Sequence, residues 1–315
     1  MPVDPQIAAV LQLLESSGAP SLASGTPDQA RATFRFTTVD MRDPSTLPQI
    51  ASVENASIDG PAGGIPVRIY RPETTSSTVP TIVFFHGGGF VIGDLDTHDD
   101  HGRLLCRDVD AVVVSVDYRL APEHKFPAGF EDCLTATRWA AEHIDSLGAD
   151  PTRLAVAGDS AGGNLAAAVA LVARDEGPRL AAQLLIYPGV DFTDDDVHQS
   201  RIDNAEGYFL TADDMQWFRN HYIADTHVLD PRASVLHAAD LAGVAPAVIG
   251  VAEFDPLRDE GEAYAKKLSD AGVEVVLHRF DGMVHGFYGM GVLSAKAAEA
   301  VQQLNADLRR LLQQQ

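Results

Sequence analysis

Hydrophobic positions along the chain fall into short runs separated by segments of helical period. Most of the runs are rich in Val and Ile and lack alternating polar positions, which is typical of strands buried on both faces of a parallel sheet. The runs that we expect to form such strands cover residues 81–85, 111–116, 154–157, 184–187, 247–251 and 275–277. Upstream, residues 52–58 and 65–70 alternate around a glycine-rich turn and predict an antiparallel opening pair.

Segments with apolar residues at helical spacing lie between these runs. They cover residues 99–108, 128–145, 161–174, 257–271 and 294–312. Strands and helices that alternate in this way form a parallel sheet with helices on both faces. The pattern therefore predicts an α/β fold with a mostly parallel central sheet.

Two stretches interrupt this alternation. Between residues 191 and 241 there is no strand candidate, and Thr211 is placed to cap a helix over 213–223. The N-terminal stretch, 5–42, holds one short helix pattern followed by Ser, Gly and Pro. A long insertion between strands is usually a lid or a binding element. The division that we expect is a small helical cap from residues 1–45 and 191–241 on a core from 46–190 and 242–315.

The composition fits one large α/β unit, because 45% of the 315 residues are hydrophobic. The formal net charge of −22 repels phosphate backbones and anionic lipid, which argues against nucleic-acid binding. No apolar run reaches the length of a membrane span and no signal peptide is visible, so we expect a cytoplasmic protein without integral membrane association. The two cysteines, Cys106 and Cys133, lack metal-site spacing and are expected to be buried free thiols.

The sequence Gly-Asp-Ser-Ala-Gly at 158–162 lies between a predicted strand and a predicted helix. This is the context of a nucleophile elbow, in which a sharp turn points a serine hydroxyl outward. The strained backbone of such a turn costs about 1–3 kcal/mol and needs a functional reason to persist. The alternative is a glycine-rich turn in which Ser160 only caps the helix. We interpret Ser160 as a nucleophile.

A second glycine-rich motif, His-Gly-Gly-Gly-Phe at 86–90, follows the predicted strand 81–85. Acyl transfer places negative charge on a carbonyl oxygen, and backbone N–H groups of consecutive glycines can approach that oxygen closely. The N–H of Ala161, directly after the nucleophile, would add another donor. A phosphate loop is the competing interpretation, but it would have a helix and often a lysine after it, and residues 90–94 (FVIGD) provide neither.

A serine nucleophile needs a histidine that accepts its proton. Of the 11 histidines, His285 lies in a glycine-flanked loop directly after a predicted strand, where ligands meet open α/β sheets. His278 falls inside that strand and is expected to be structural. His98 and His101 lie near the start of a helix, in a position to line a pocket. His285 is therefore our candidate for the base that activates Ser160.

The base in turn needs an acid that orients it and stabilises its charged form. Asp255 follows a predicted strand and gives the chain order Ser160, Asp255, His285 that is expected for a hydrolase sheet. Glu253 is the second candidate for this acid, and Asp191 is the third.

With these motifs the chain resembles the hormone-sensitive-lipase-like esterases of the α/β-hydrolase fold, from about residue 53 to the C-terminus. The motifs that carry the resemblance are HGGGF at 86–90, DYRLAPE at 117–123, GDSAGG at 158–163, DPLRDEG at 255–261 and HGF at 285–287. The resemblance implies Gly87 and Gly88 as oxyanion donors beside Ala161, a helical cap, and no cofactor or metal. The Asp before the nucleophile is similar to the larger bacterial branch of that family.

Together these features predict a serine carboxylesterase, lipase-like, that hydrolyses short- to medium-chain esters through an acyl-enzyme intermediate. An amide-directed hydrolase, such as a deacetylase or formamidase, would use the same triad. A non-catalytic small-molecule receptor is a further alternative, which the intact motif around His285 disfavours. The expected partner is a small-molecule ester, and a homodimer is a further hypothesis. The side chains expected to wall the pocket, or else to pack in the core, are Phe90, Val91, Phe209, Leu210 and Trp217.

Overall fold

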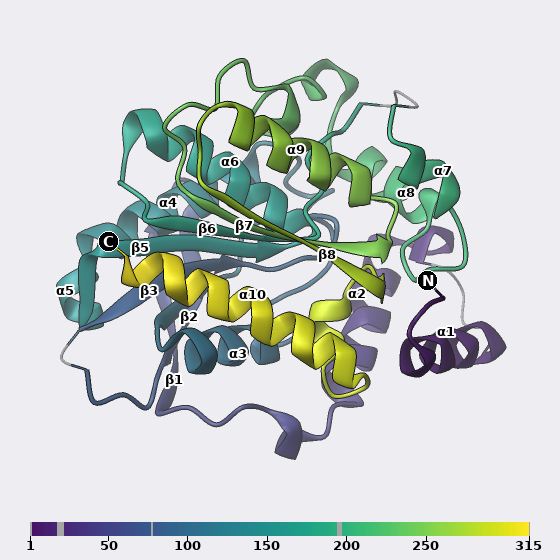
Figure 1. Ribbon diagram of the computed structural model, residues 1–315, viewed down its shortest axis with the longest axis horizontal. Coiled ribbons are helices and arrows are strands. Elements are labelled where there is room, and N and C mark those ends of the chain that lie inside the picture. Colours follow the sequence, from purple (N-terminus) through teal and green to yellow (C-terminus); the bar gives the residue numbers. More distant parts are fainter. Residues whose placement is uncertain (1, 18–21, 77, 194–196, 315) are drawn as a thin grey trace.

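The computed structural model describes residues 2–17, 22–76, 78–193 and 197–314, and places one eight-stranded sheet at their centre (Figure 1). The strands are β1 (Ser52–Gly60), β2 (Gly63–Arg71), β3 (Val79–Phe85), β4 (Val112–Val116), β5 (Ala149–Asp159), β6 (Ala182–Ile186), β7 (Ala247–Phe254) and β8 (Val275–Val284). Their order across the sheet is β1-β2-β4-β3-β5-β6-β7-β8. The β1–β2 and β2–β4 pairs are antiparallel and the others are parallel. The predicted α/β fold with a mostly parallel sheet is confirmed.

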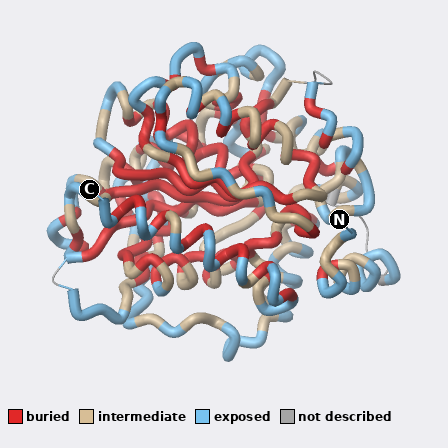
Figure 2. Tube along the Cα trace, in the orientation of Figure 1, coloured by how far each residue is buried: buried red, intermediate tan, exposed pale blue. Residues whose placement is uncertain are grey.

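Helices cover both faces of this sheet. On one face lie α3 (Asp99–Val109) and α10 (Ala295–Gln313), and on the other lie α4 (Ala128–Glu142), α6 (Ala161–Glu176) and α9 (Arg258–Asp270). Figure 2 shows that the central strands and the inner sides of these helices are buried, whereas the edge strand β1 is mostly exposed. Two clusters of buried apolar side chains result, one on each side of the sheet. Helices on both faces explain why the predicted parallel strands lack a polar side.

One predicted helix, 128–145, is divided in the structure. α4 ends at Glu142, and α5 (Ile144–Leu147) follows after His143. The φ and ψ of His143, −106° and 15°, depart from helical values, and its ring Nδ1 lies 2.9 Å from the carbonyl oxygen of Trp139. The apolar spacing continues through this break, so the sequence pattern alone does not reveal it.

The N-terminal stretch contains two helices instead of one, α1 (Pro5–Ser17) and α2 (Pro27–Arg35). The second begins at a capping box, in which Thr26 Oγ1 accepts from Gln29 N–H and Gln29 Oε1 accepts from Thr26 N–H. Thr-Pro-Asp-Gln was the local signal for this start.

The expected cap segments both lie at the carboxyl ends of the parallel strands (Figure 1). The insertion carries α7 (Gln199–Asp203) and α8 (Ala212–Tyr222), and Thr211 caps α8 as predicted. One link between the segments is the Ala23 N–H, which donates to Asp214 Oδ1 at 3.2 Å. The N-terminal segment is also tied to the core, since Asp4 N–H donates to the Gly282 carbonyl at 2.9 Å. Parts of the expected cap, 18–21 and 194–196, lie outside the described residues.

Short turns of other helix types complete the described chain. They are 3₁₀ turns at Leu22–Ser24, Pro44–Thr46, Asp225–His227, Val235–His237 and Phe287–Met290, and a π-helical turn at Phe36–Asp40. Cys106 in α3 and Cys133 in α4 are buried free thiols, as predicted. Within the described ranges, we find no helix that is both long enough and apolar enough to cross a bilayer.

Candidate active site

Ser160 lies at the sharp turn between β5 and α6. Its φ of 55° and ψ of −116° fall outside the regions that L-residues favour. The turn closes this tightly because Gly158 and Gly162 lack side chains. A Cβ on Gly158 would meet the carbonyl oxygen of Gly162, and one on Gly162 would meet that of Phe85. The two glycines therefore allow the strained turn in which Ser160 lines a cavity.

The structure brings the three predicted triad residues together. His285 Nε2 lies 2.9 Å from Ser160 Oγ, and His285 Nδ1 lies 2.8 Å from Asp255 Oδ2. Since an ionised carboxylate can only accept, the Nδ1–H donates to Asp255, and Nε2 is left to accept the serine hydroxyl proton. Asp255 is fully buried, and its other oxygen accepts the Leu257 N–H at 2.8 Å. The chain holds its base in one tautomer, aimed at Ser160.

The other acids considered for this position are engaged elsewhere. Glu253 Oε2 accepts the Gly282 N–H at 2.7 Å. The two oxygens of Asp191 lie 3.0 Å from His198 Nε2 and 3.0 Å from His237 Nε2. Neither arrangement involves His285.

The loop after β3 presents two glycines with positive φ to the same cavity. Gly88 and Gly89 have φ values of 110° and 57°, in the region that favours glycine. A Cβ on Gly88 would meet the carbonyl oxygen of Ile92, and one on Gly89 would meet the ring of Phe218. Among the hydrogen bonds of the described residues, the N–H groups of Gly88, Gly89 and Ala161 have no protein acceptor. These three donors are available to a ligand.

Gly87 does not fit the donor role expected for it. Its N–H already donates to Asp159 Oδ1 at 2.9 Å, because the side chain of the residue before the nucleophile reaches back to the glycine loop. Gly89 lines the cavity with Ser160, whereas Gly87 is not among the described residues that do so. We therefore correct the expected donor set from Gly87, Gly88 and Ala161 to Gly88, Gly89 and Ala161.

His86 supports the glycine loop from beneath. It is completely buried, and its Nδ1–H donates to the Gly87 carbonyl at 2.7 Å. Burial, aided by the nearby ring of His98, lowers the pKa of His86 to about 4, so the ring is neutral at pH 7. The Tyr118 hydroxyl donates to the His86 carbonyl at 2.7 Å. These contacts fix the loop in place.

A cavity of about 2000 Å³ opens above Ser160 and His285. Of the predicted wall residues, Phe90, Phe209 and Leu210 line it. His98 and His101 line it too, as the position of these histidines before and within a helix suggested. The cavity reaches from the nucleophile turn to the N-terminal and insertion segments.

Two other predicted wall residues are not among the described residues that line this cavity. Val91 is fully buried in the apolar core, and its N–H donates to the Gly88 carbonyl at 3.1 Å. Trp217 is partly buried against the apolar core, and its ring centroid lies 4.2 Å from that of His221. Its neighbour Phe218 faces the cavity instead, because successive helix positions are rotated by about 100°. The spacing of residues along the predicted helix in the insertion was the signal that would have identified Phe218, and not Trp217, as a wall residue.

An ion pair in the wall of the cavity was not predicted. Glu260 lies in the first turn of α9, where negative charge is favoured. It is also fully buried, bonded to Arg201 at 2.7 Å and to the Val190 N–H at 2.7 Å. The pair joins the insertion to the core, and both of its residues line the cavity.

Comparisons with known proteins agree with this geometry. A family model described as alpha/beta hydrolase fold matches residues 82–289. The chain is 49% identical to "Carboxylic ester hydrolase LipN" of Mycobacterium tuberculosis over 83% of its length and 71% of that protein. It is 37% identical to "Ethyl acetate hydrolase" of Pseudomonas putida over 96% of each chain. The solved hyperthermophilic esterase of Pyrobaculum calidifontis superposes with a TM-score of 0.93 at 42% identity, covering 98% of this chain and 99% of that one.

Proposed function

The chain belongs to the hormone-sensitive-lipase-like branch of the α/β-hydrolase fold family, and from this premise we propose that Ser160, His285 and Asp255 hydrolyse carboxylic esters. The protein is a carboxylic ester hydrolase, as are the similar proteins named above. One observation supports the assignment of residues most directly, namely the hydrogen-bonded chain from Ser160 Oγ through His285 to Asp255.

In the first half of the reaction Ser160 Oγ attacks the ester carbonyl carbon while His285 Nε2 accepts its proton. The tetrahedral intermediate collapses as His285 returns that proton to the leaving alcohol, which leaves an acyl group on Ser160. Water then enters, gives a proton to His285, and attacks the acyl carbon. Collapse of the second intermediate releases the acid and restores the serine hydroxyl. Asp255 holds the imidazole in the required tautomer throughout.

Negative charge on the two intermediates is stabilised by the N–H groups of Gly88, Gly89 and Ala161. Such donors act because they are fixed before the charge develops, and removing one donor typically costs about 2.7–4 kcal/mol of transition-state stabilisation. The positive end of α6, whose first residue is Ala161, points at the same place. His86 and Asp159 hold the glycine loop, which sets the direction of these groups.

The apolar lining of the cavity fits the acyl part of a short- to medium-chain ester. The amide-directed alternative is not favoured, because the similar proteins are named as esterases. A non-catalytic receptor does not need a histidine within hydrogen-bonding distance of a strained serine, which this chain has.

The homodimer expected from the resemblance and the cytoplasmic location expected from the sequence remain our proposals. Light scattering that returns a monomer mass across micromolar concentrations would contradict the dimer.

The proposed reaction is tested with p-nitrophenyl esters from acetyl to long acyl chains, using the wild type and Ser160→Ala. We expect fast cleavage of short chains by the wild type and a loss of about a millionfold in kcat in the variant, as when other serine hydrolases lose the nucleophile. Equal, slow release by both proteins would exclude Ser160 as the nucleophile.

A further inference from the structure

Three buried side chains beside the nucleophile turn converge on one part of the cavity wall. They are His98, His101 and Asp159, each less than a tenth exposed, and all three line the cavity. One potential ligand atom from each lies within 4.8 Å of the others. The proposed hydrolysis does not use either histidine.

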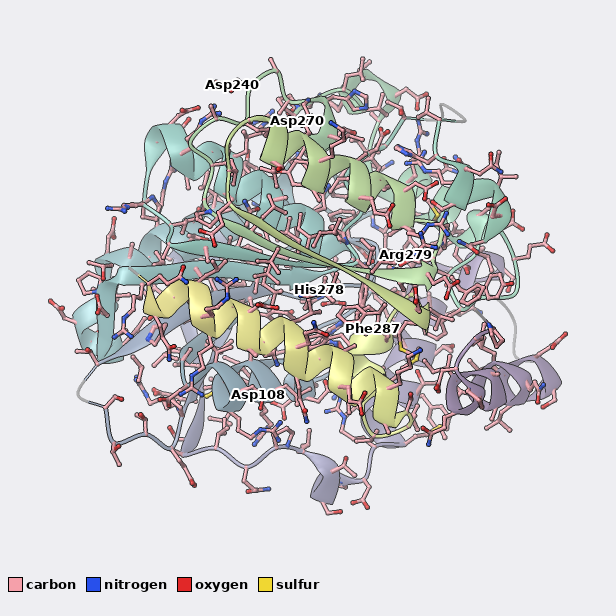
Figure 3. The ribbon with its side chains drawn as sticks, viewed as in Figure 1. Asp108, Asp240, Asp270, His278, Arg279 and Phe287 are labelled. Atoms are coloured by element: carbon pink, nitrogen blue, oxygen red, sulfur yellow. The ribbon has the colours of Figure 1, made fainter. Side chains whose placement is uncertain are left out.

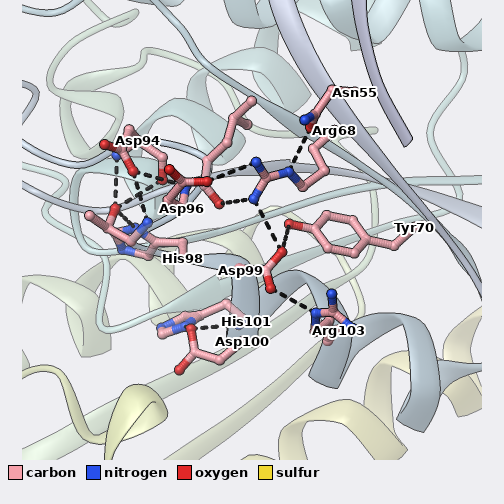
Figure 4. A network of polar contacts seen from close by, with 12 residues as sticks. Asn55, Arg68, Tyr70, Asp94, Asp96, His98, Asp99, Asp100, His101 and Arg103 are labelled. Atoms are coloured by element: carbon pink, nitrogen blue, oxygen red, sulfur yellow. Dashed lines mark hydrogen bonds and ion pairs between the residues drawn. The ribbon is translucent and has the colours of Figure 1, made fainter. Parts of the chain in front are cut away.

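Sequence position explains the convergence of the two histidines. His98 directly precedes α3 and His101 lies in its first turn, so the three-residue spacing places both rings on one side of the helix. The ring centroids are 4.9 Å apart. Asp159 comes from a different element, the carboxyl end of β5. Figure 4 shows the two histidines within the polar network at the start of α3.

The surroundings of His98 allow the tautomer that a metal ligand needs. Thr97 Oγ1 accepts the Asp94 N–H at 2.8 Å and lies 2.9 Å from both the Asp94 carbonyl oxygen and His98 Nδ1. When the hydroxyl donates to that carbonyl, Thr97 Oγ1 accepts from the His98 Nδ1–H. In the neutral ring this leaves an unshared electron pair on His98 Nε2, on the side that faces Asp159.

His101 is held in the same tautomer. Its Nδ1 lies 2.8 Å from Asp100 Oδ1, a carboxylate oxygen that can only accept. The Nδ1–H therefore donates to Asp100, and the electron pair of the neutral ring lies on Nε2. Histidines that bind metals usually donate their other N–H to a carboxylate or another oxygen, which fixes the ring in this way.

Asp159 divides its two oxygens between two tasks. Oδ1 accepts the Gly87 N–H at 2.9 Å, and Oδ2 lies 3.7 Å from His98 Nε2. That separation is too long for a hydrogen bond but suits two atoms that share a cation. One imidazole nitrogen from each histidine and one carboxylate oxygen thus lie within 4.8 Å of one another in a buried place.

We propose that His98 Nε2, His101 Nε2 and Asp159 Oδ2 form a binding site for a divalent transition-metal ion such as Zn²⁺. Imidazole nitrogen and carboxylate oxygen are the ligands that Zn²⁺ takes, at about 2.0–2.2 Å. Ligands at that distance in a tetrahedron lie about 3.4 Å apart, so small side-chain rotations close the present spacing. Because the three residues line the cavity, the fourth position is open to water.

The proposed ion also affects the esterase site, and this part of the inference rests on the proposed function. Asp159 immediately precedes Ser160, and its Oδ1 anchors the glycine loop through the Gly87 N–H. An ion bound to this carboxylate alters the hydrogen bond that anchors the glycine loop. It also adds positive charge near the place where His285 becomes charged. We therefore expect bound Zn²⁺ to slow ester hydrolysis.

Binding is tested by titrating the EDTA-dialysed full chain with Zn²⁺ in a calorimeter and by measuring the melting temperature with and without the metal. His98→Gln and His101→Gln remove one ligand each. His278→Gln is the matched control, because His278 lies on β8 away from the cluster and pairs with Asp307 at 2.8 Å (Figure 3).

We expect one tight equivalent and a raised melting temperature for the wild type and for His278→Gln. His98→Gln and His101→Gln should each bind Zn²⁺ at least tenfold more weakly and should show no rise in melting temperature with the metal. Equal affinity in all four proteins, or no binding by the wild type, would overturn the site.

Replacing a buried imidazole can disturb folding, so a second measurement uses the wild type alone. The X-ray absorption spectrum of the Zn²⁺-loaded protein should show the outer-ring scattering of two imidazole ligands, with oxygen atoms as the remaining ligands. A spectrum with one imidazole or none overturns the assignment, whatever the variants do.

The coupling is tested separately by steady-state hydrolysis at saturating Zn²⁺. We expect kcat of the wild type to fall between about 5- and 150-fold, the usual range of coupling between sites, and the kcat of His101→Gln to change little on adding Zn²⁺. Equal inhibition of both proteins would show that the inhibiting ion binds elsewhere. Failure of the proposed esterase function would leave the calorimetric result unaffected.

Discussion

Ser160 has a backbone conformation that costs free energy, and its hydroxyl is hydrogen-bonded to His285. A residue with φ near 55° and ψ near −116° persists only where its surroundings determine it, and here the Ser160 N–H donates to the Ile186 carbonyl at 2.8 Å. The glycines at 158 and 162 permit the turn by leaving out side chains that would meet backbone oxygens. The strained turn is explained by its result, because it places the Ser160 hydroxyl at the cavity, within hydrogen-bonding distance of His285.

Asp255→Asn tests the role of the acid. The amide would donate to His285 and favour the wrong tautomer, with the proton on Nε2 facing Ser160. We expect kcat to fall by about 10⁴ with little change in KM, as when the same change is made in other triads. Steady-state kinetics on p-nitrophenyl acetate measure it. Glu253→Gln is the control and should stay near the wild type, since Glu253 bonds to Gly282 instead; a comparable loss there would count against Asp255.

Phe218→Ala tests the wall of the acyl pocket. The ring of Phe218 lies against Gly89 and lines the cavity, so its removal should make room for longer acyl chains. We expect the ratio of kcat/KM for octanoyl over acetyl esters to rise about tenfold, which corresponds to a few methylene contacts. Trp217→Ala is the comparison, because Trp217 packs on His221. An unchanged ratio in Phe218→Ala, or an equal rise in Trp217→Ala, would refute this pocket.

Motifs and their spacing predict the proposed triad residues well, but they predict the residues around the triad less well. Ser160, Asp255 and His285 each directly follow a strand, so the sheet itself brings them together. The choice between Gly87 and Gly89 depends on where a side chain from another strand, Asp159, places its oxygen. No local pattern carries that information. The same holds for the meeting of His98 and His101 with Asp159.

At the scale of elements, Arg31 is one of the side chains that hold α2 against the core, beside Arg35, which pairs with Asp94 and Asp96. Arg31 donates to the carbonyls of Val91 and Ala121 at 2.8 and 2.9 Å, and forms a paired contact with Glu123. Val91 lies directly after the glycine loop, and Ala121 and Glu123 both lie in the DYRLAPE motif. The N-terminal segment is thus held against the loop that carries the proposed oxyanion donors.

Arg31→Ala should lower the free energy of unfolding by about 1–3 kcal/mol, because it leaves part-buried carbonyls and Glu123 without their donor. Urea unfolding monitored by circular dichroism measures the change. Arg138→Ala is the matched control, since its pair with Glu176 is exposed and should contribute less than about 1 kcal/mol. Equal effects of the two substitutions would show that Arg31 does not anchor α2.

Strands and long helices could be predicted because burial on both faces leaves a clear apolar signature. Every predicted strand and long helix is present, with the break between α4 and α5 as the main departure. The expected cap segments gave weaker signals, since contacts between residues far apart in the sequence place them, such as Asn204 Nδ2 to the Asp255 carbonyl at 3.1 Å. That contact links the insertion to the loop of the proposed acid.

At the scale of the whole molecule, the net charge of −22 leaves acidic groups close to one another. Asp117 is an example on the DYRLAPE segment. Burial, together with the charges of Asp94 and Asp96, raises its pKa from 3.8 to about 6. The folded state therefore binds this proton more tightly than the unfolded state does. Protonated Asp117 therefore contributes to the free energy of unfolding. This contribution is fully present below pH 4 and is lost as the pH rises through about 6.

Asp117→Asn removes this penalty by keeping the group neutral. We expect the variant to be more stable than the wild type by about 1–2 kcal/mol at pH 7, and equally stable at pH 4. Urea unfolding at the two pH values measures the difference. Asp59→Asn, at an exposed position of β1, is the comparison substitution. A variant of Asp117 that is less stable at pH 7 would mean that the charged carboxylate is stabilising.

The central claim is that Ser160, activated by His285 and Asp255, forms a covalent bond to the acyl group. The most direct measurement is the mass of the intact protein, followed by peptide mapping, during inactivation by a p-nitrophenyl phosphonate ester. We predict one adduct per chain on Ser160, formed in parallel with the loss of esterase activity and absent in Ser160→Ala. An adduct on another residue, or full activity in protein that carries the adduct on Ser160, would contradict the account.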